Sequence, residues 1–273
     1  MTQTSETEGD EAVDRLARAG FAAKGTLYAV LGLLAVRLGL GGSGAGDTSQ
    51  QGAITSLADQ QPFGSLLVGL LAVGLTGYAL FRAVQIFRGD AASFSSLPDW
   101  LARITFAVRA IIYAGLAFLA WRELLGGGGG DDETEQSATA AVLEMPGGQW
   151  VVLAVAVIIL IVGGKQIHEG WTCGFRDHLG FHGISGGART RLEWMGRVGH
   201  VARGIVFLVS GGFLGLAAWR HDPDQGVGLD AALQEVVEAP YGPFLLTAIG
   251  VGLVLYGAFC FVEARYLRAS RAD

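Results

Sequence analysis

Charge is scarce in this chain, and acidic residues are missing altogether from several long stretches. Only 16% of the 273 residues are Asp, Glu, Lys or Arg, whereas about 25% is typical of soluble domains. The acid-free apolar runs are 19–40, 63–81, 104–121, 149–164, 198–219 and 239–262. Because about 20 mostly apolar residues cross the hydrocarbon core, the sequence predicts an integral membrane protein and excludes an ordinary soluble domain.

Other absences narrow the function. The first fourteen residues hold no basic residue, so they do not resemble the start of a cleavable signal peptide. The two cysteines, Cys173 and Cys260, fall in a loop and in an apolar run, so a disulfide is not expected. No GxSxG, HExxH or phosphate-loop motif is present. With a net charge of −6, the sequence predicts no enzyme, no cofactor and no nucleic-acid partner.

The basic residues indicate an orientation. Sixteen of the 19 Lys and Arg residues flank the apolar runs on one side, and only Arg37, Arg122 and Arg220 lie on the other. Lys and Arg are enriched on the cytoplasmic side of membrane proteins. We therefore expect a multi-pass protein of the cell membrane with both termini in the cytoplasm and outer loops near 41–62, 123–148 and 220–242.

One pattern occurs three times and opens every second apolar run. The copies are LARAGFAAKGTLYAVLG from Leu16, LARITFAVRAIIYAGLA from Leu101 and MGRVGHVARGIVFLVSG from Met195. In each copy a turn with proline, which suits a first helical turn, precedes a second run. The sequence predicts an all-α fold: a six-helix transmembrane bundle from three tandem two-helix repeats. Two spans per repeat keep all copies in one orientation, which allows a pseudo-threefold axis along the membrane normal.

The expected boundaries follow from this pattern. Repeat 1 covers 16–90, repeat 2 covers 99–170 and repeat 3 covers 195–268, with a cytoplasmic connection at 171–194. The acidic segment 1–15 precedes them, and its composition is typical of a disordered tail.

The triple pattern, together with GLDAALQEVVEAPYGPFLL in the third repeat, resembles a bacterial membrane family known as a domain of unknown function, number twelve hundred and six. The resemblance extends from about Leu16 to Arg268 and implies repeated pairs of transmembrane helices. It carries over no activity. The second repeat departs most, with Thr105 and Ala110 where the other two have glycine.

Aligning the repeats superimposes two sets of polar residues at the predicted cytoplasmic ends. The cations are Lys24, Arg109 and Arg203, and the facing polar groups are Gln85, Glu169 and Glu263. One interpretation is that the cations snorkel, with their stems in hydrocarbon and their heads at the lipid headgroups. The other is an inward ring of cations that pairs with the carboxylates and contacts an anionic lipid or solute.

A metal site is a weaker hypothesis. Cys173, His178 and His182 are close in sequence, but their spacing is loose for a site that needs about four ligands. We therefore expect an ordinary polar loop and no metal.

The sequence leaves two functions open. It favours a structural protein that binds membrane lipids, a protein partner or a second copy of itself. The alternative is a transporter or channel-like protein for a small, anionic solute, because transporters often contain internal repeats. A membrane enzyme using the His/Cys loop ranks last.

Overall fold

A computed structural model describes residues 2–41, 50–58, 64–88, 99–126, 142–143, 145–175, 186–220 and 241–266. Within these residues the chain forms seven helices, and no other regular element is longer than one turn. The helices are α1 (Thr2–Gly39), α2 (Gln50–Ala58), α3 (Gly64–Arg88), α4 (Asp99–Leu124), α6 (Gly148–Thr172), α7 (Gly186–Arg220) and α9 (Gly242–Tyr266). The predicted all-α fold is confirmed.

Several of these helices are long and apolar enough to cross a membrane. Five candidate spans are found in the described part of the chain: Arg15–Gly39, Gly64–Ile86, Gly148–Thr172, Gly186–Arg220 and Gly242–Tyr266. The run at 104–121, the expected sixth span, lies in the 26-residue helix α4, which is not among the five. Membrane-crossing helices are thus supported, and the count of six stays a prediction.

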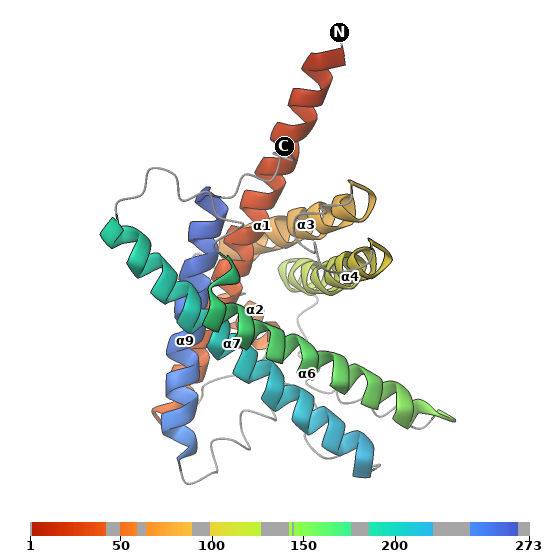
Figure 1. Cartoon of the computed structure of the whole chain (residues 1–273), viewed down its shortest axis with the longest axis vertical. Helices are drawn as coiled ribbons and strands as arrows, with labels where there is room; N and C mark the ends of the chain where they lie inside the picture. Colours follow the sequence, from red (N-terminus) through yellow and green to blue (C-terminus); the bar gives the residue numbers. More distant parts are fainter. Residues whose placement is uncertain are drawn as a thin grey trace.

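The long helices pack as three pairs, α1 with α9, α3 with α4, and α6 with α7 (Figure 1). Each pair joins the first helix of one repeat to the second helix of another: α4 to α3 of repeat 1, α7 to α6 of repeat 2, and α1 to α9 of repeat 3. Within repeats, α1 also packs against α3 and α7 against α9. The long helices therefore follow one another in the order α4, α3, α1, α9, α7 and α6, and the pseudo-threefold axis stays a prediction.

Small residues allow close approach within these pairs. A Cβ atom on Gly25 of α1 would lie 2.8 Å from the carbonyl oxygen of Gly257 on α9. At the equivalent crossing, a Cβ atom on Gly204 of α7 would lie 2.8 Å from the carbonyl oxygen of Gly163 on α6. Glycine at such crossings lets membrane helices pack backbone against backbone.

The core is most aromatic toward one end of the bundle. We call this the basic end: α4 and α7 begin there, and α3, α6 and α9 end there. Tyr78 packs edge-on against Phe21 and Tyr113, with ring centroids 5.4 and 4.4 Å apart. Tyr28 packs edge-on against Tyr256 at 4.9 Å. The phenol groups give the interior of the basic end a polar lining, which positions the site.

Two helices extend beyond the boundaries expected from the sequence. The backbone of 2–14, expected to be disordered, is helical and continues α1; extending an existing helix is easier than starting one. The expected connection 171–194 is partly helical, because α7 begins at Gly186. Arg189 and Glu193, one turn apart, form an ion pair of 2.9 Å in this extension.

Candidate functional site

Lys24 points into the bundle. Its side chain is only 6% exposed, and its ammonium lies over the rings of Phe21 and Tyr256, at 5.4 and 5.1 Å from their centroids. Aromatic faces attract cations, and they do so more strongly where water is excluded. This placement agrees with the inward interpretation of Lys24 and not with snorkelling.

Arg203 reaches the same aromatic group from α7. Its Nη1 donates to the Tyr256 hydroxyl at 2.7 Å, and its guanidinium also lies over the ring of Tyr28. With its amide oriented to suit both neighbours, Gln166 accepts from Arg203 Nη1 at 2.6 Å and donates to Glu169 Oε2 at 2.9 Å. Arg203 and Glu169 are therefore linked through Gln166 instead of forming a direct ion pair.

Arg109 is partly buried on α4. The positive charges of Arg82 and Arg203 both act on it. Lys24 and Arg203 likewise act on each other. The three aligned cations therefore converge at the basic end, although each comes from a different repeat.

Arg82 of α3 was not predicted as a site residue. Its Nη1 donates to Gln85 Oε1 and its Nη2 to the Tyr78 hydroxyl, both at 2.6 Å. In the sequence it lies near the end of an apolar run, where a cation is usually a membrane flank. Its spacing of three residues from Gln85 is the one signal that could have indicated a pair on one helix face.

The repeat relates these residues as three equivalent clusters, one at each helix pair. The α9 cluster contains Lys24, Cys260 and Glu263; the α6 cluster contains Arg203, Gln166 and Glu169; the α3 cluster contains Arg109, Arg82 and Gln85. The first two clusters each hold one cation and one carboxylate. The α3 cluster holds two cations, and Gln85 replaces the carboxylate.

The α3 cluster holds more positive charge than the other two, and Glu263 of the α9 cluster acts on it. Glu263 acts on Arg82 electrostatically, but it also acts on Lys24 and Arg203. Three buried polar atoms here, Arg82 Nε, Arg203 Nε and Glu263 Oε2, have no hydrogen-bond partner within the described residues. Buried polar atoms are normally satisfied by protein, water or an ion. The two Nε groups are donors that an anion or a water molecule would satisfy, whereas the Glu263 oxygen needs a donor.

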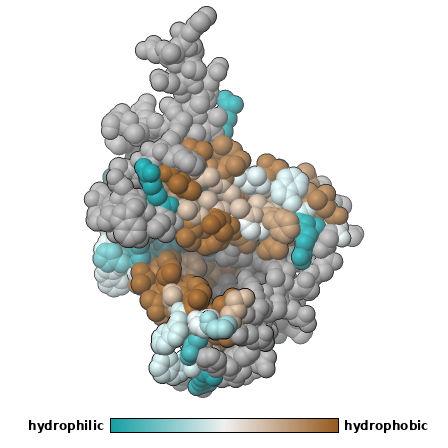
Figure 2. Space-filling model, turned by 90° about the vertical axis from the view of Figure 1, so that its right-hand side faces the viewer, coloured by the Kyte–Doolittle hydropathy of each residue, from teal (hydrophilic) through white to brown (hydrophobic). Residues whose placement is uncertain are grey.

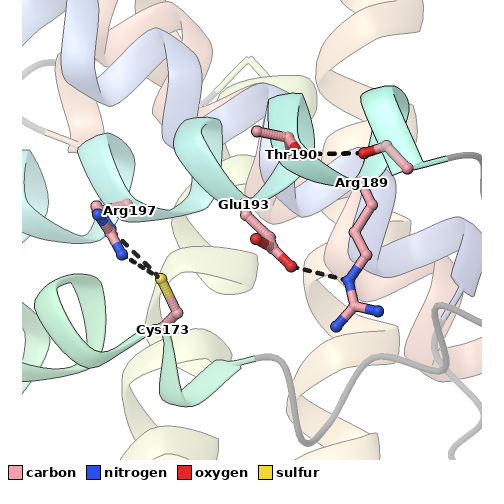
Figure 3. Close-up of polar contacts among 6 residues, drawn as sticks. Cys173, Arg189, Thr190, Glu193 and Arg197 are labelled. Carbon is pink, nitrogen blue, oxygen red and sulfur yellow. Dashed lines mark hydrogen bonds and ion pairs between the residues drawn. The ribbon is translucent and has the colours of Figure 1, made fainter.

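The described histidine and cysteine residues of this connection contact aromatic and basic side chains. His200 occupies the position of Phe21 in repeat 1 and stacks on Phe175 at 5.1 Å. Cys173, at the end of α6, accepts from Arg197 Nη2 at 3.2 Å, as Figure 3 shows. His178 and His182 lie outside the described residues, and among those that are described no group of three His, Cys, Asp or Glu residues could hold a metal ion.

Comparisons with known proteins agree with the repeat. The model of the family called Domain of Unknown Function (DUF1206) matches three segments, 19–89, 104–172 and 198–267. A relative from Bacillus subtilis (strain 168), "Uncharacterized protein YxxB", is 30% identical over 254 residues, which cover 93% of this chain and 91% of that protein. No solved structure matches. The chain therefore belongs to the DUF1206 family, with three copies of the family's segment in tandem.

Proposed function

We propose that the protein is a non-enzymatic, six-span protein of the cell membrane that binds the phosphate of anionic lipids at its basic end. In this proposal both termini lie in the cytoplasm, α4 is the sixth span, and the repeats surround a pseudo-threefold axis. Lipid binding is the function that the sequence favours, and the test below also distinguishes it from transport of a small anion.

The exposed surface supports insertion in a bilayer. Figure 2 views the side toward which α3, α4 and α6 extend in Figure 1, and apolar side chains gather across it. On α6, the exposed side chains Trp150 and Trp171 lie 21 residues apart. At 1.5 Å per residue this separation is about 30 Å, close to the thickness of the hydrocarbon core. Tryptophan is enriched at both membrane interfaces.

The observation that carries the binding proposal is the α3 cluster. The positive charge of Arg82 acts on Arg109 there, and Gln85 stands where the other two clusters have glutamate, so this cluster brings two cations together. Like charges at membrane depth are costly unless they are compensated. An anionic phosphate offers several acceptor oxygens, and guanidinium groups bind phosphate well.

Native mass spectrometry of the detergent-solubilised protein tests this proposal. We expect added phosphatidylglycerol to bind and phosphatidylcholine to bind more weakly. Replacing Arg82 and Arg109 with Gln should weaken phosphatidylglycerol binding about tenfold or more, since each cation near a membrane surface adds about 1 kcal/mol. A double Gln variant of the exposed residues Arg37 and Arg220 removes equal charge at the opposite end and is the control.

The proposal is wrong if both lipids bind equally to the unaltered protein, or if the Arg82 and Arg109 variant keeps full affinity. Inorganic phosphate forms a second arm. If phosphate competes at low concentration and phosphatidylglycerol does not bind, the site takes a soluble anion, and the transporter alternative replaces lipid binding.

A further inference from the structure

Repeats 1 and 3 each close tightly on themselves. A Cβ atom on Gly20 of α1 would lie 2.5 Å from Tyr78 Cβ on α3. At the equivalent position of repeat 3, a Cβ atom on Gly199 of α7 would lie 2.8 Å from Tyr256 Cβ on α9. Each tyrosine therefore packs directly onto the backbone of the other helix, at a site that only glycine leaves open.

A second tight contact lies along the same helices. A Cβ atom on Gly74 would lie 2.5 Å from Ala23 Cβ, and one on Gly252 would lie 2.3 Å from Ala202 Cβ. The two repeats thus use the same set of glycine, alanine and tyrosine to join their first and second helices. In both repeats, these four residues pack the first helix closely against the second.

Repeat 2 has different residues at all four positions. Thr105 and Val108 on α4 replace the glycine and the alanine, and Ile158 and Val162 on α6 replace the glycine and the tyrosine. With these residues, the close glycine, alanine and tyrosine contacts of repeats 1 and 3 cannot form. Accordingly, α4 and α6 form no pair of the kind seen between α1 and α3, and they run apart in Figure 1.

The consequence is an uncovered apolar surface in repeat 2. We call it the α4–α6 face, and it comprises Val108, Ile112, Val155, Ile158 and Val162. These side chains are between 41% and 57% exposed, whereas their non-glycine counterparts in repeats 1 and 3 are 6% exposed or less. Along α4 the face spans four residues, or about 6 Å, and along α6 it spans seven residues, or about 10 Å, at 1.5 Å per residue.

The α4–α6 face lies beside the cations. Arg109 lies on α4 between Val108 and Ile112, and Gln166, which contacts Arg203, lies one turn beyond Val162 on α6. Apolar side chains therefore lie next to Arg109 on α4 and one turn from a glutamine that binds Arg203 on α6, so apolar surface and positive charge are adjacent, as are the acyl chains and phosphate of a phospholipid standing in the cytoplasmic leaflet.

We propose that the α4–α6 face docks the acyl chains of an anionic phospholipid, which enters sideways from the bilayer and places its phosphate beside the α3 cluster. This inference rests on the proposed function. It adds the path by which the lipid enters and the surface that binds its acyl chains. A second copy of the chain would cover the apolar side chains, but it would bring a second set of the same cations, whereas an anionic phospholipid brings a charge of the opposite sign.

Introducing the four packing residues of repeat 3 into repeat 2 tests the proposal. The variant carries Thr105→Gly, Val108→Ala, Ile158→Gly and Val162→Tyr, which are the residues of repeat 3. We expect binding of phosphatidylglycerol, measured by native mass spectrometry, to fall about tenfold, comparable to the loss of a juxtamembrane cation. Binding of water-soluble glycerol phosphate should persist, since the α3 cluster is unchanged. A matched variant with Val151→Ala and Val157→Ala, on α6 outside the face, is the control.

Photolabelling gives a readout that does not depend on the folding of this four-residue variant. Phosphatidylglycerol with a diazirine in its acyl chain should label α4 and α6 of the unaltered protein at the α4–α6 face, as read by peptide mass spectrometry. Labels spread evenly over all helices, or a dimer that excludes the lipid, would overturn the inference. If the four-residue variant keeps lipid while the Arg82 and Arg109 variant loses it, the proposed function stands and the entry route is wrong. If neither variant loses lipid, both proposals fail.

Discussion

Gly25 and Gly257 lie backbone against backbone where α1 crosses α9. A Cβ atom on Gly25 would lie 2.8 Å from the carbonyl oxygen of Gly257, and one on Gly257 would lie 2.6 Å from that of Gly25. This contact joins the first helix of the chain to its last long helix. It brings repeats 1 and 3 together, although they lie at opposite ends of the chain.

We therefore expect Gly257→Leu to destabilise the fold. The added side chain must displace the backbone of α1, and overpacking of this kind typically costs about 1–3 kcal/mol. Thermal unfolding in detergent, followed by tryptophan fluorescence, measures the change. Gly212→Leu is the control, because a Cβ atom on this helical glycine meets nothing within 4 Å. Equal loss in the two variants would contradict the role of the crossing.

The sequence could predict the helices and the repeat, but not which helices pair. Apolar runs and proline turns mark each helix locally, so they are visible without a structure. The pairing of α1 with α9 depends on residues more than two hundred positions apart. Once the pairs are known, the repeat also explains Ala79 and Ala110 of the α3–α4 pair, which occupy the positions of Gly257 and Gly25.

Tyr256→Phe should destabilise the basic end without altering packing. The hydroxyl of Tyr256 accepts the 2.7 Å bond from Arg203 Nη1, and hydrogen bonds to charged groups contribute about 1.5–3 kcal/mol. The unfolding temperature should fall. Tyr241→Phe makes the same chemical change at a side chain that is 83% exposed and should have little effect. Matching shifts in both variants would contradict this role for Tyr256.

The proposed topology can be tested with engineered cysteines in a chain whose two native cysteines are replaced. Cysteine at position 43 or 137, in predicted outer loops, should react with a membrane-impermeant maleimide in intact cells. Cysteine at position 269, near the C-terminus, should react only after the membrane is permeabilised. If position 137 resists labelling in intact cells, α4 is not a span and the count of six is wrong.

Only part of the candidate site could be predicted from the sequence. The aligned residues Lys24, Arg109 and Arg203 were predicted from the repeat, because equivalent positions must occupy equivalent places. Arg82 was missed, since its counterparts Gln166 and Cys260 are uncharged and alignment gives no reason to choose it. Its role depends on α3 lying beside α4, which is a property of the folded chain alone.

Gln85→Glu tests the charge argument directly, because it gives the α3 cluster the carboxylate of the other two. Gln85 Oε1 already accepts from Arg82 Nη1 at 2.6 Å, so the new charge lies beside a cation. We expect the unfolding temperature of the lipid-free protein to rise and phosphatidylglycerol binding to weaken. Gln149→Glu, near the other end of α6, is the control.

The opposite substitution, Glu263→Gln, removes a carboxylate that acts on Lys24, Arg82 and Arg203. It should strengthen phosphatidylglycerol binding and lower the stability of the lipid-free protein, because the cations then depend more on the bound phosphate. Native mass spectrometry and thermal unfolding measure the two effects. A rise in affinity for both Gln85→Glu and Glu263→Gln would show that affinity does not follow the charge of the clusters, since the two substitutions change that charge in opposite directions.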